Sequence, residues 1–313
     1  MRTDLPQNGK RIRDRILAPG RDLSHRLNHQ LSHRLPHRRP DRHRGRGLFG
    51  SELVTMFRRR RTLAILAVLA GVPVLLGVVI KTIAEPTPGE GPPMLDRVTQ
   101  NGLFLGVTSL IMSTSLFLPL AVGVVAGDSV AGESGLGTLR YLLVAPAGRT
   151  RLLAVKAVSA MVFCAAAPLT VVLAGTVVAL ALFPIGPVTL LSGDTVGVPE
   201  SIVRTLLVAG YVAVSMLGLA AIGVFISTVT DVPVGAMAAT VSLAIIAQIL
   251  DGIPQLTWLH PWLFSHWWLS MGDLLRTPIA WSSFASNALL QGGYLLVFGS
   301  AAWARFTTRD VLS

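Results

Sequence analysis

Charged side chains are scarce in this sequence. Asp, Glu, Lys and Arg make up only 14% of its 313 residues, whereas soluble domains average about a quarter. Hydrophobic residues account for 51%, and the mean hydropathy is +0.60. Six apolar runs contain no Asp, Glu, Lys, Arg or His, and each is long enough to cross a bilayer as a helix. The composition therefore predicts an all-α integral membrane protein.

Chemically reactive groups are also few. The one cysteine, Cys164, lies inside an apolar run, so no intrachain disulfide can form and packing is its expected role. Within the six runs only Gln248, Asn287 and Gln291 are strongly polar. Carriers driven by proton or ion gradients usually place ionisable residues at membrane depth, and an intramembrane hydrolase needs a base or a nucleophile pair. The sequence argues against both classes, so energy for uphill transport must come from a partner.

The six runs are predicted to be transmembrane helices. They cover residues 62–80, 103–126, 157–183, 206–228, 233–250 and 285–304. Lys and Arg are concentrated before the first run, where residues 1–61 hold 17 of them against 5 acidic residues. Beyond this segment, six basic residues fall in predicted inner segments and four in outer ones. By the positive-inside rule, both termini are predicted to be cytoplasmic, in the plasma membrane.

Residues 1–50 are rich in Arg, His and Pro, which predicts a basic, disordered arm. We expect it to lie near anionic lipid headgroups, although a misplaced start codon would explain it equally well. Its histidines repeat every four residues, a spacing that could bind a metal, but prolines interrupt the helix that would align them. These histidines are His25, His29, His33 and His37. No nucleic-acid-reading module accompanies the arm, so no nucleic-acid partner is expected.

The segment between the fifth and sixth runs carries five of the six tryptophans. Indole rings prefer the headgroup region, so aromatic anchoring at the outer leaflet is the favoured interpretation, with a substrate gate as the alternative. Pro254 and Pro261 argue against one continuous helix there. His260 and His266 lie in this segment without acidic neighbours in the sequence, so we interpret them as interfacial side chains.

Two segments on the predicted cytoplasmic side are amphipathic. Residues 51–61, SELVTMFRRRR, suit a short helix in the membrane interface. Residues 127–156 carry acids at the start and bases at the end, which predicts a helix that begins near Ser134 and stops at Pro146. Such a helix could contact a cytoplasmic partner or only float at the surface. The stretch GDSVAGES is not a P-loop, because Glu133 replaces the lysine that must reach the phosphates.

A longer pattern runs through the second of these segments: G-D-S-V-A-G-E-x-x-x-G-T-L-R-x-L-L-x-x-P-x-x-R, with a lysine seven residues later. Together with Glu52, the arginine run and the closing residues 304–312, it resembles type-two ABC export permeases, the group that includes drug and antibiotic-resistance exporters. The resemblance covers residues 51–313, which form the predicted six-helix permease domain, and leaves out the arm.

The resemblance implies that two such permease units pair and bind two separate ATPase subunits on the cytoplasmic side. This chain would then be no enzyme and would bind no cofactor or metal, with ATP held by the partner. The interfacial helix and a coupling helix between the second and third spans would dock on the ATPase. The implied coupling-loop residues are Asp128, Glu133, Gly137, Thr138, Arg140, Pro146, Arg149 and Lys156. Those of the interfacial helix are Glu52, Met56, Phe57 and Arg58.

The predicted cargo is a small amphipathic or hydrophobic molecule, such as a drug, an antibiotic or a lipid. Two other classes stay open on the sequence alone. An ATPase-independent channel or carrier should show a polar path through the spans, and a membrane enzyme or scaffold should show a reactive cluster near one membrane face. The spans and loops offer little of either.

Overall fold

The computed structural model describes residues 44–83, 101–102, 104–135, 149–184, 186, 188–189 and 194–308. Met1–Gly47 and Leu48–Ser313 form separate compact units. Residues 1–43 of the predicted disordered arm lie outside the described ones, whereas residues 44–50 belong to a helix, so the prediction was wrong for them.

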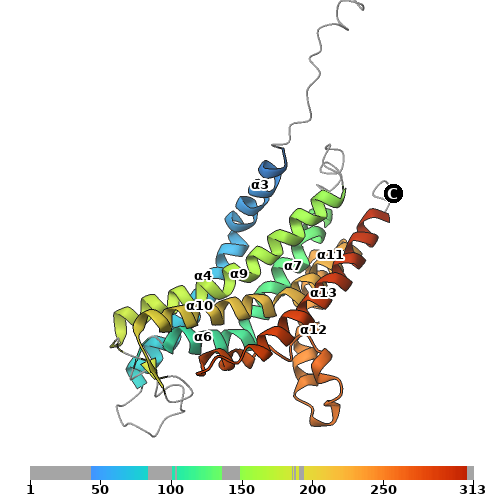
Figure 1. Cartoon of the computed structure of the whole chain (residues 1–313). Helices are drawn as coiled ribbons and strands as arrows, with labels where there is room; N and C mark the ends of the chain where they lie inside the picture. The colour runs from blue at the N-terminus through green and yellow to red at the C-terminus, as the bar shows by residue number, and fades with distance from the viewer. Residues whose placement is uncertain are drawn as a thin grey trace, which may run out of the picture. The chain divides into compact units, whose positions relative to one another are not determined.

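Helices dominate the unit Leu48–Ser313 (Figure 1). The α-helices are α3 (Arg44–Arg58), α4 (Arg60–Ile83), α6 (Phe104–Ser115), α7 (Phe117–Gly135), α9 (Arg149–Leu182), α10 (Val198–Ser215), α11 (Leu217–Val229), α12 (Pro233–Asp251) and α13 (Trp281–Thr308). The 3-10 helices are η1 (Pro254–Leu256), η2 (His260–Trp262) and η3 (Ser270–Leu275), and β1 (Val188–Thr189) pairs antiparallel with β2 (Thr195–Val196).

Four helical stretches of the described chain are long and apolar enough to cross a membrane. They are Arg60–Thr82, Arg149–Leu182, Val198–Val229 and Pro233–Asp251. The pair α6 and α7 passes the same test only together and bends by 57° between its two helices, so the described chain has four such stretches, or five where the bent pair is counted as one span. The predicted all-α membrane protein is confirmed at this level. The sixth predicted span lies in α13, which is not among the helices that pass, so a count of six is not confirmed.

The bend between α6 and α7 has a local cause in the sequence. Pro119 lies at the third position of α7 and has no N–H to donate to the carbonyl of Ser115, where α6 ends. A proline ring also crowds the carbonyl four residues before it, which breaks or kinks a helix. Leu116 separates the two helices at this point. The second predicted span is therefore a broken helix rather than a straight one.

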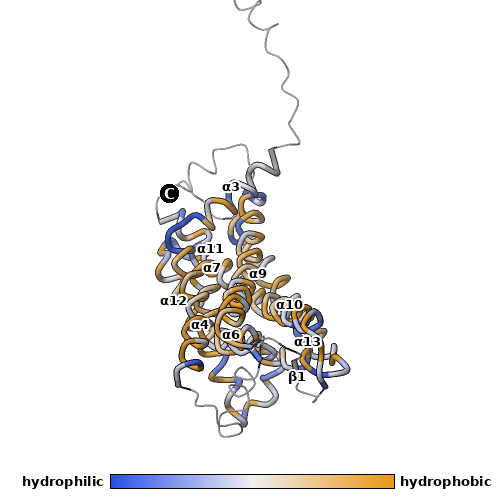
Figure 2. The backbone as a smooth tube through the Cα atoms, turned by 90° about the vertical axis from the view of Figure 1, so that its left-hand side faces the viewer, coloured by the Kyte–Doolittle hydropathy of each residue, from blue (hydrophilic) through white to orange (hydrophobic). Residues whose placement is uncertain are grey.

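Hydrophobic side chains fill the interior and also cover the outside of the helices. α7 and α11 pack against each other, while α9 lies along α4, α6 and α10. Leu173, Leu289 and Leu296 are exposed by 61%, 78% and 76%, and Figure 2 shows apolar residues along most of the helical tube. Soluble proteins rarely expose apolar surface on this scale. The outer faces of these helices suit contact with lipid tails.

Two glycines of α7, four residues apart, lie close to α12. A Cβ atom added at Gly127 would lie 2.8 Å from the Cα atom of Met237, and one at Gly123 would lie 2.8 Å from Cγ2 of Val241. Both positions face α12, so this pair allows α7 and α12 to touch along their backbones. A Cβ atom at Gly102 would also be crowded, 2.7 Å from Cβ of Phe183, whereas one at Gly106 would lie 3.7 Å from the nearest atom.

A buried polar network fastens α13 to its neighbours. Gln291 accepts a hydrogen bond from the Gly218 N–H at 3.0 Å and donates to the Phe264 carbonyl at 2.9 Å. One turn earlier, Asn287 donates to the Ser215 hydroxyl at 2.7 Å. Asn287 and Gln291 are fully buried, so each bond satisfies a group that water cannot reach.

We expect Gln291→Leu to lower the free energy of unfolding by about 1–3 kcal/mol, because it leaves the Gly218 N–H and the Phe264 carbonyl buried without this partner. Denaturant titration in detergent micelles measures the change. The exposed Ser286 on the same helix provides a control, since Ser286→Leu should shift stability by no more than about 0.5 kcal/mol. Equal effects of the two substitutions would contradict the importance of the network.

The segment between α12 and α13 consists of short 3-10 helices and turns, which confirms that Pro254 and Pro261 prevent one continuous helix there. Trp258 and Trp262 are 70% exposed, as anchoring in a headgroup layer requires. Trp268 is different, because it is buried and its ring N–H donates to the Ser215 carbonyl at 2.9 Å. The interpretation of all these tryptophans as interfacial anchors was wrong for Trp268, which is a core residue.

Candidate functional site

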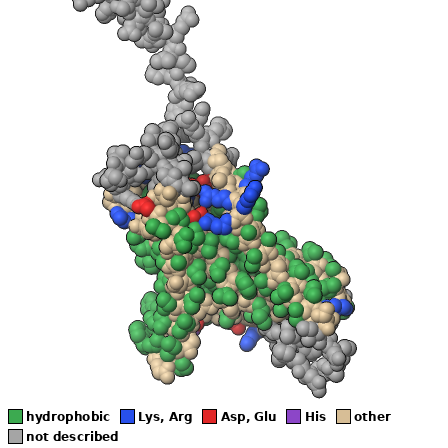
Figure 3. Space-filling model, turned by 180° about the vertical axis from the view of Figure 1, so that it is seen from behind, with side chains coloured by type: hydrophobic (Ala, Val, Ile, Leu, Met, Phe, Trp, Pro, Cys, Tyr) green, Lys and Arg blue, Asp and Glu red, His purple; other side chains and the backbone are tan. Residues whose placement is uncertain are grey.

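The most concentrated charges in the described chain lie where α3 meets α4 beside the end of α7 and the start of α9. Basic and acidic side chains lie together near the top of Figure 3, above a largely apolar surface. We call this the ion-pair cluster. Its members are Glu52, Arg59, Arg61, Asp128, Glu133 and Lys156.

Lys156 is the buried centre of the ion-pair cluster. Only 2% of its side chain is exposed, and its Nζ lies 2.5 Å from Oε1 of Glu133 and 3.1 Å from Oε1 of Glu52. An ammonium removed from water is costly unless opposite charge and hydrogen bonds compensate it. These two carboxylates supply that compensation, and they tie α9 to α7 and to α3.

Asp128 is the second meeting point of the ion-pair cluster. Its Oδ2 accepts from Nη1 of Arg59 at 3.2 Å and also from Arg61. Nη2 of Arg59 lies 3.9 Å from Oε1 of Glu133, which connects the two halves of the cluster. Three carboxylates therefore meet three cations, so the formal charge of the group is zero. Neutral networks of this kind hold helices in register without leaving a net buried charge.

Apolar contacts support the ion-pair cluster from below. The rings of Phe57 and Phe163 lie 6.5 Å apart between centroids, and Met56 also packs on the main hydrophobic core. The cavity among the charged residues has a volume of about 30 Å³, roughly the space of one water molecule. It has no room for a nucleotide or an organic substrate, so a mechanical role suits it better than a binding role.

The structure describes only half of the predicted coupling-loop residues. Asp128 and Glu133 lie within α7, which continues to Gly135, and the rest of the helix predicted from near Ser134 to Pro146 falls outside the described residues. Arg149 begins α9 and donates to the Thr307 carbonyl at 3.4 Å, and Lys156 lies two turns further on. The remaining predicted residues, Gly137, Thr138, Arg140 and Pro146, lie outside the described residues.

Residues 51–58 of the predicted interfacial segment form the last part of α3, and Arg60 and Arg61 begin α4. Glu52 joins the ion-pair cluster, Met56 and Phe57 pack on the core, and Arg58 is exposed. The apolar side chains at 56 and 57 thus face protein, whereas the sequence predicted an apolar side in lipid. Their neighbours in the hydrophobic core come from other helices, which periodicity within 51–61 does not reveal.

The sequence prediction missed Arg59 and Arg61 as cluster members, although it included their neighbour Arg58. The signal was present, because two acidic residues at 128 and 133 continue an apolar helix and need cations nearby. Arg59 and Asp128 are 69 positions apart. Only the packing of α4 beside α7 brings them together.

A family of uncharacterised proteins, described as "Protein of unknown function (DUF2705)", matches residues 95–312, well over half of the chain. The chain belongs to the DUF2705 family. No curated protein matches it. The DUF2705 region includes α6 to α13, and so Asp128, Glu133 and Lys156. Because α3 and α4 precede that region, the ion-pair cluster joins the part shared with the family to the preceding segment.

Proposed function

We propose that this DUF2705 protein is the membrane-spanning permease subunit of an ABC-type exporter, driven by ATP that a separate subunit hydrolyses. The observation that carries the proposal is the ion-pair cluster. It joins α3 to α7 and α9, the two helices that lead into and out of residues 136–148. Those residues hold the middle of the pattern that resembles the permease coupling loop.

The ion-pair cluster fixes the helices on either side of residues 136–148 to each other and to α3. A partner that binds residues 136–148 can shift a transport equilibrium only through contacts that differ between the two states. Because Lys156 connects α9 with both α7 and α3, a displacement of the loop moves three helices together. If flexible, exposed side chains joined these helices, the loop could move without moving them. The predicted coupling residues therefore act mechanically, and none is catalytic.

An apolar cavity of about 200 Å³ supports an amphipathic or hydrophobic cargo. It lies between α9, α11 and α13, and its lining is mostly apolar, with Leu153, Met161, Val224, Leu295 and Trp303 as its larger residues. Apolar walls with few polar groups suit an alkyl chain or a flat drug-like molecule. A channel for ions or sugars would need a polar lining along its path.

The proposed transporter contains two permease units and two ATPase subunits in the plasma membrane. We count α13 as the sixth span, which places both termini on the cytoplasmic side with the arginine run. The ion-pair cluster then lies at the cytoplasmic ends of α4, α7 and α9, within reach of a soluble ATPase. The segment between α12 and α13 lies on the outer side.

Co-purification tests this function. We expect full-length protein carrying a C-terminal affinity tag, extracted from native membranes in mild detergent, to bring down a soluble ATPase at a near one-to-one ratio by quantitative mass spectrometry. Arg140→Glu reverses a charge in the predicted loop and should abolish recovery. Arg276→Glu is the matched control, because this exposed arginine lies in the predicted outer segment, and it should leave recovery unchanged.

Two results would contradict the proposal. Recovery of the protein without any ATPase in several mild detergents would favour a channel, a carrier or a scaffold. Equal loss with Arg140→Glu and Arg276→Glu would show that either charge reversal disrupts the protein, which would remove residues 136–148 as the docking segment.

A further inference from the structure

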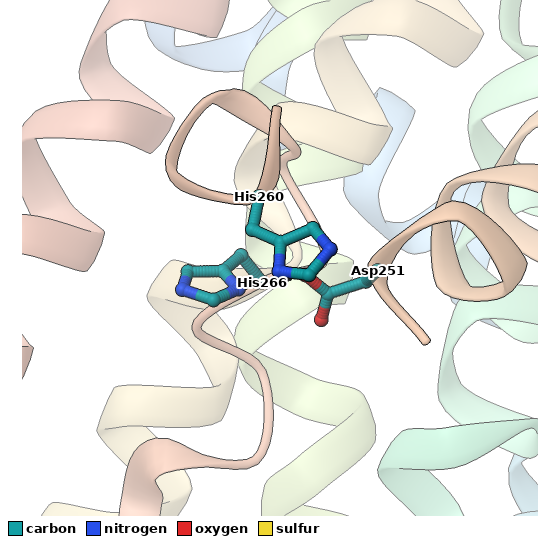
Figure 4. Close-up of side chains that lie close together, drawn as sticks. All are labelled: Asp251, His260 and His266. Atoms are coloured by element: carbon teal, nitrogen blue, oxygen red, sulfur yellow. Dashed lines mark hydrogen bonds and ion pairs between the residues drawn. The ribbon is translucent and has the colours of Figure 1, made fainter. Parts of the chain in front are cut away.

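Three side chains that commonly bind metal ions converge between α12 and α13. Asp251 is the last residue of α12, His260 begins η2, and His266 follows in a turn (Figure 4). One ligand atom from each lies within 4.8 Å of the other two. Nδ1 of His266 is 2.7 Å from Oδ1 of Asp251. The sequence showed no acid near these histidines, whereas the structure places Asp251 beside them.

The hydrogen bond of His260 prepares its ring for metal binding. Its Nε2 lies 3.1 Å from the carbonyl oxygen of Ile253. A carbonyl oxygen only accepts, so Nε2 must carry the proton, and in the neutral ring Nδ1 keeps the lone pair. Metal-ligating histidines almost always donate their other ring N–H to a carbonyl or carboxylate in this way.

The backbone holds these ligands on short, hydrogen-bonded turns. The N–H of Leu263 donates to the His260 carbonyl at 3.1 Å, and the N–H of His266 donates to the Leu263 carbonyl at 3.0 Å. The ring of His266 also meets Trp267 edge-on, with centroids 5.1 Å apart. Such restraints reduce the entropy that binding must remove.

From this arrangement we propose that Asp251, His260 and His266 form a binding site for a divalent transition-metal ion, with zinc as the best match. Two imidazole nitrogens and one carboxylate oxygen are a common zinc ligand set, with water in the fourth position. The side chains of His266 and Asp251 are 30% and 26% exposed, so water can reach that position. Calcium and magnesium prefer oxygen ligands and fit this set less well.

The observed spacing needs little change to accept zinc. Ligand atoms about 2.0–2.1 Å from a tetrahedral zinc ion lie about 3.3 Å apart. The present separations, 2.7 Å between His266 and Asp251 and at most 4.8 Å within the set, bracket that value. On binding, the ion replaces the Nδ1 proton of His266. In the neutral ring this proton moves to Nε2, and from a doubly protonated ring one proton is released to solvent.

Bound zinc would strengthen the connection between the end of α12 and the loop that follows it. Asp251 belongs to α12, while the residues around His266 are tied to other helices. Tyr211 of α10 donates to the Trp267 carbonyl at 2.6 Å, and Tyr294 of α13 donates to the Trp262 carbonyl at 2.8 Å. The ion would therefore fix the end of α12 to α10 and α13. This role is independent of the proposed transport function.

Zinc binding is tested on the full-length protein with an affinity tag that contains no histidine. The protein is treated with a chelator, desalted and titrated with zinc sulfate by calorimetry, and retained zinc is counted by elemental analysis after gel filtration. We expect the loop to hold one zinc ion per chain and zinc to raise the melting temperature. His260→Gln, His266→Gln and Asp251→Asn should each weaken this binding at least about 10- to 100-fold, the range that even outer-shell substitutions cause.

The basic arm provides the matched control, because it also carries histidines. A variant with glutamine at four arm positions should keep the loop zinc; these positions are His25, His29, His33 and His37. The melting temperature of each variant is first measured without zinc, which shows whether the variant folds. Asp251→Asn removes a ligand with the smallest change in side-chain shape. Wild-type affinity in any of the three loop variants, or loss of all zinc in the arm variant, would overturn the proposal.

Discussion

Lys156→Met should lower the free energy of unfolding by about 3–5 kcal/mol, the range found when one partner of a buried ion pair is removed. Methionine fills a similar volume but leaves Glu133, whose side chain is 12% exposed, without its closest cation. Arg59 is 3.9 Å away and cannot replace a contact of 2.5 Å. Denaturant titration in mixed micelles measures the loss.

Two further variants separate charge from packing. Lys156→Met combined with Glu133→Gln removes both charges of the closest pair, so we expect it to recover part of the stability lost by the single change, because only Glu52, which is 24% exposed, is then left without the ammonium. Arg151→Met alters an exposed cation on the same helix and should change stability by no more than about 0.5 kcal/mol. A loss below about 1 kcal/mol for Lys156→Met would show that water already solvates the cluster.

The predicted spans fall almost entirely on helices of the structure, and several of these helices continue past the predicted ends. Uncharged apolar runs mark the part of a helix that faces lipid, and residues 233–250 nearly coincide with α12. Charges were used to end the second span at 126, but α7 continues to Gly135 through Asp128 and Glu133. A helix can carry charges past an apolar run when distant residues compensate them, and composition within a window does not show those residues.

Pairings between distant segments account for the rest of what the sequence did not reveal. Lys156 and Glu52 are 104 positions apart, and His266 lies 15 positions from Asp251 across several turns. The sequence prediction singled out Lys156, Glu52, His260 and His266 one by one, but it did not pair them or include Asp251. Their proximity depends on helix packing and on the turns after α12, which no local pattern encodes.

Gly127→Val should destabilise the protein by about 3 kcal/mol, because the new side chain would meet backbone rather than a flexible neighbour. Its Cβ alone would lie 2.8 Å from both Cα and N of Met237, so α7 and α12 must separate, and overpacking of this kind typically costs about 1–3 kcal/mol or more. Gly71→Val is the control, since nothing lies within 4 Å of that position on α4. It should change stability by no more than about 0.5 kcal/mol.

The same substitution also links helix packing to the ion-pair cluster. Asp128 follows Gly127 directly, so a displaced α7 carries Asp128 away from Arg59 and Arg61. We therefore expect Gly127→Val and Lys156→Met together to cost less than the sum of their separate effects, by at least about 0.5 kcal/mol, as substitutions in one network do. Strict additivity in this double-mutant cycle would mean that α7 bends locally at Gly127 and leaves the ion pairs in place.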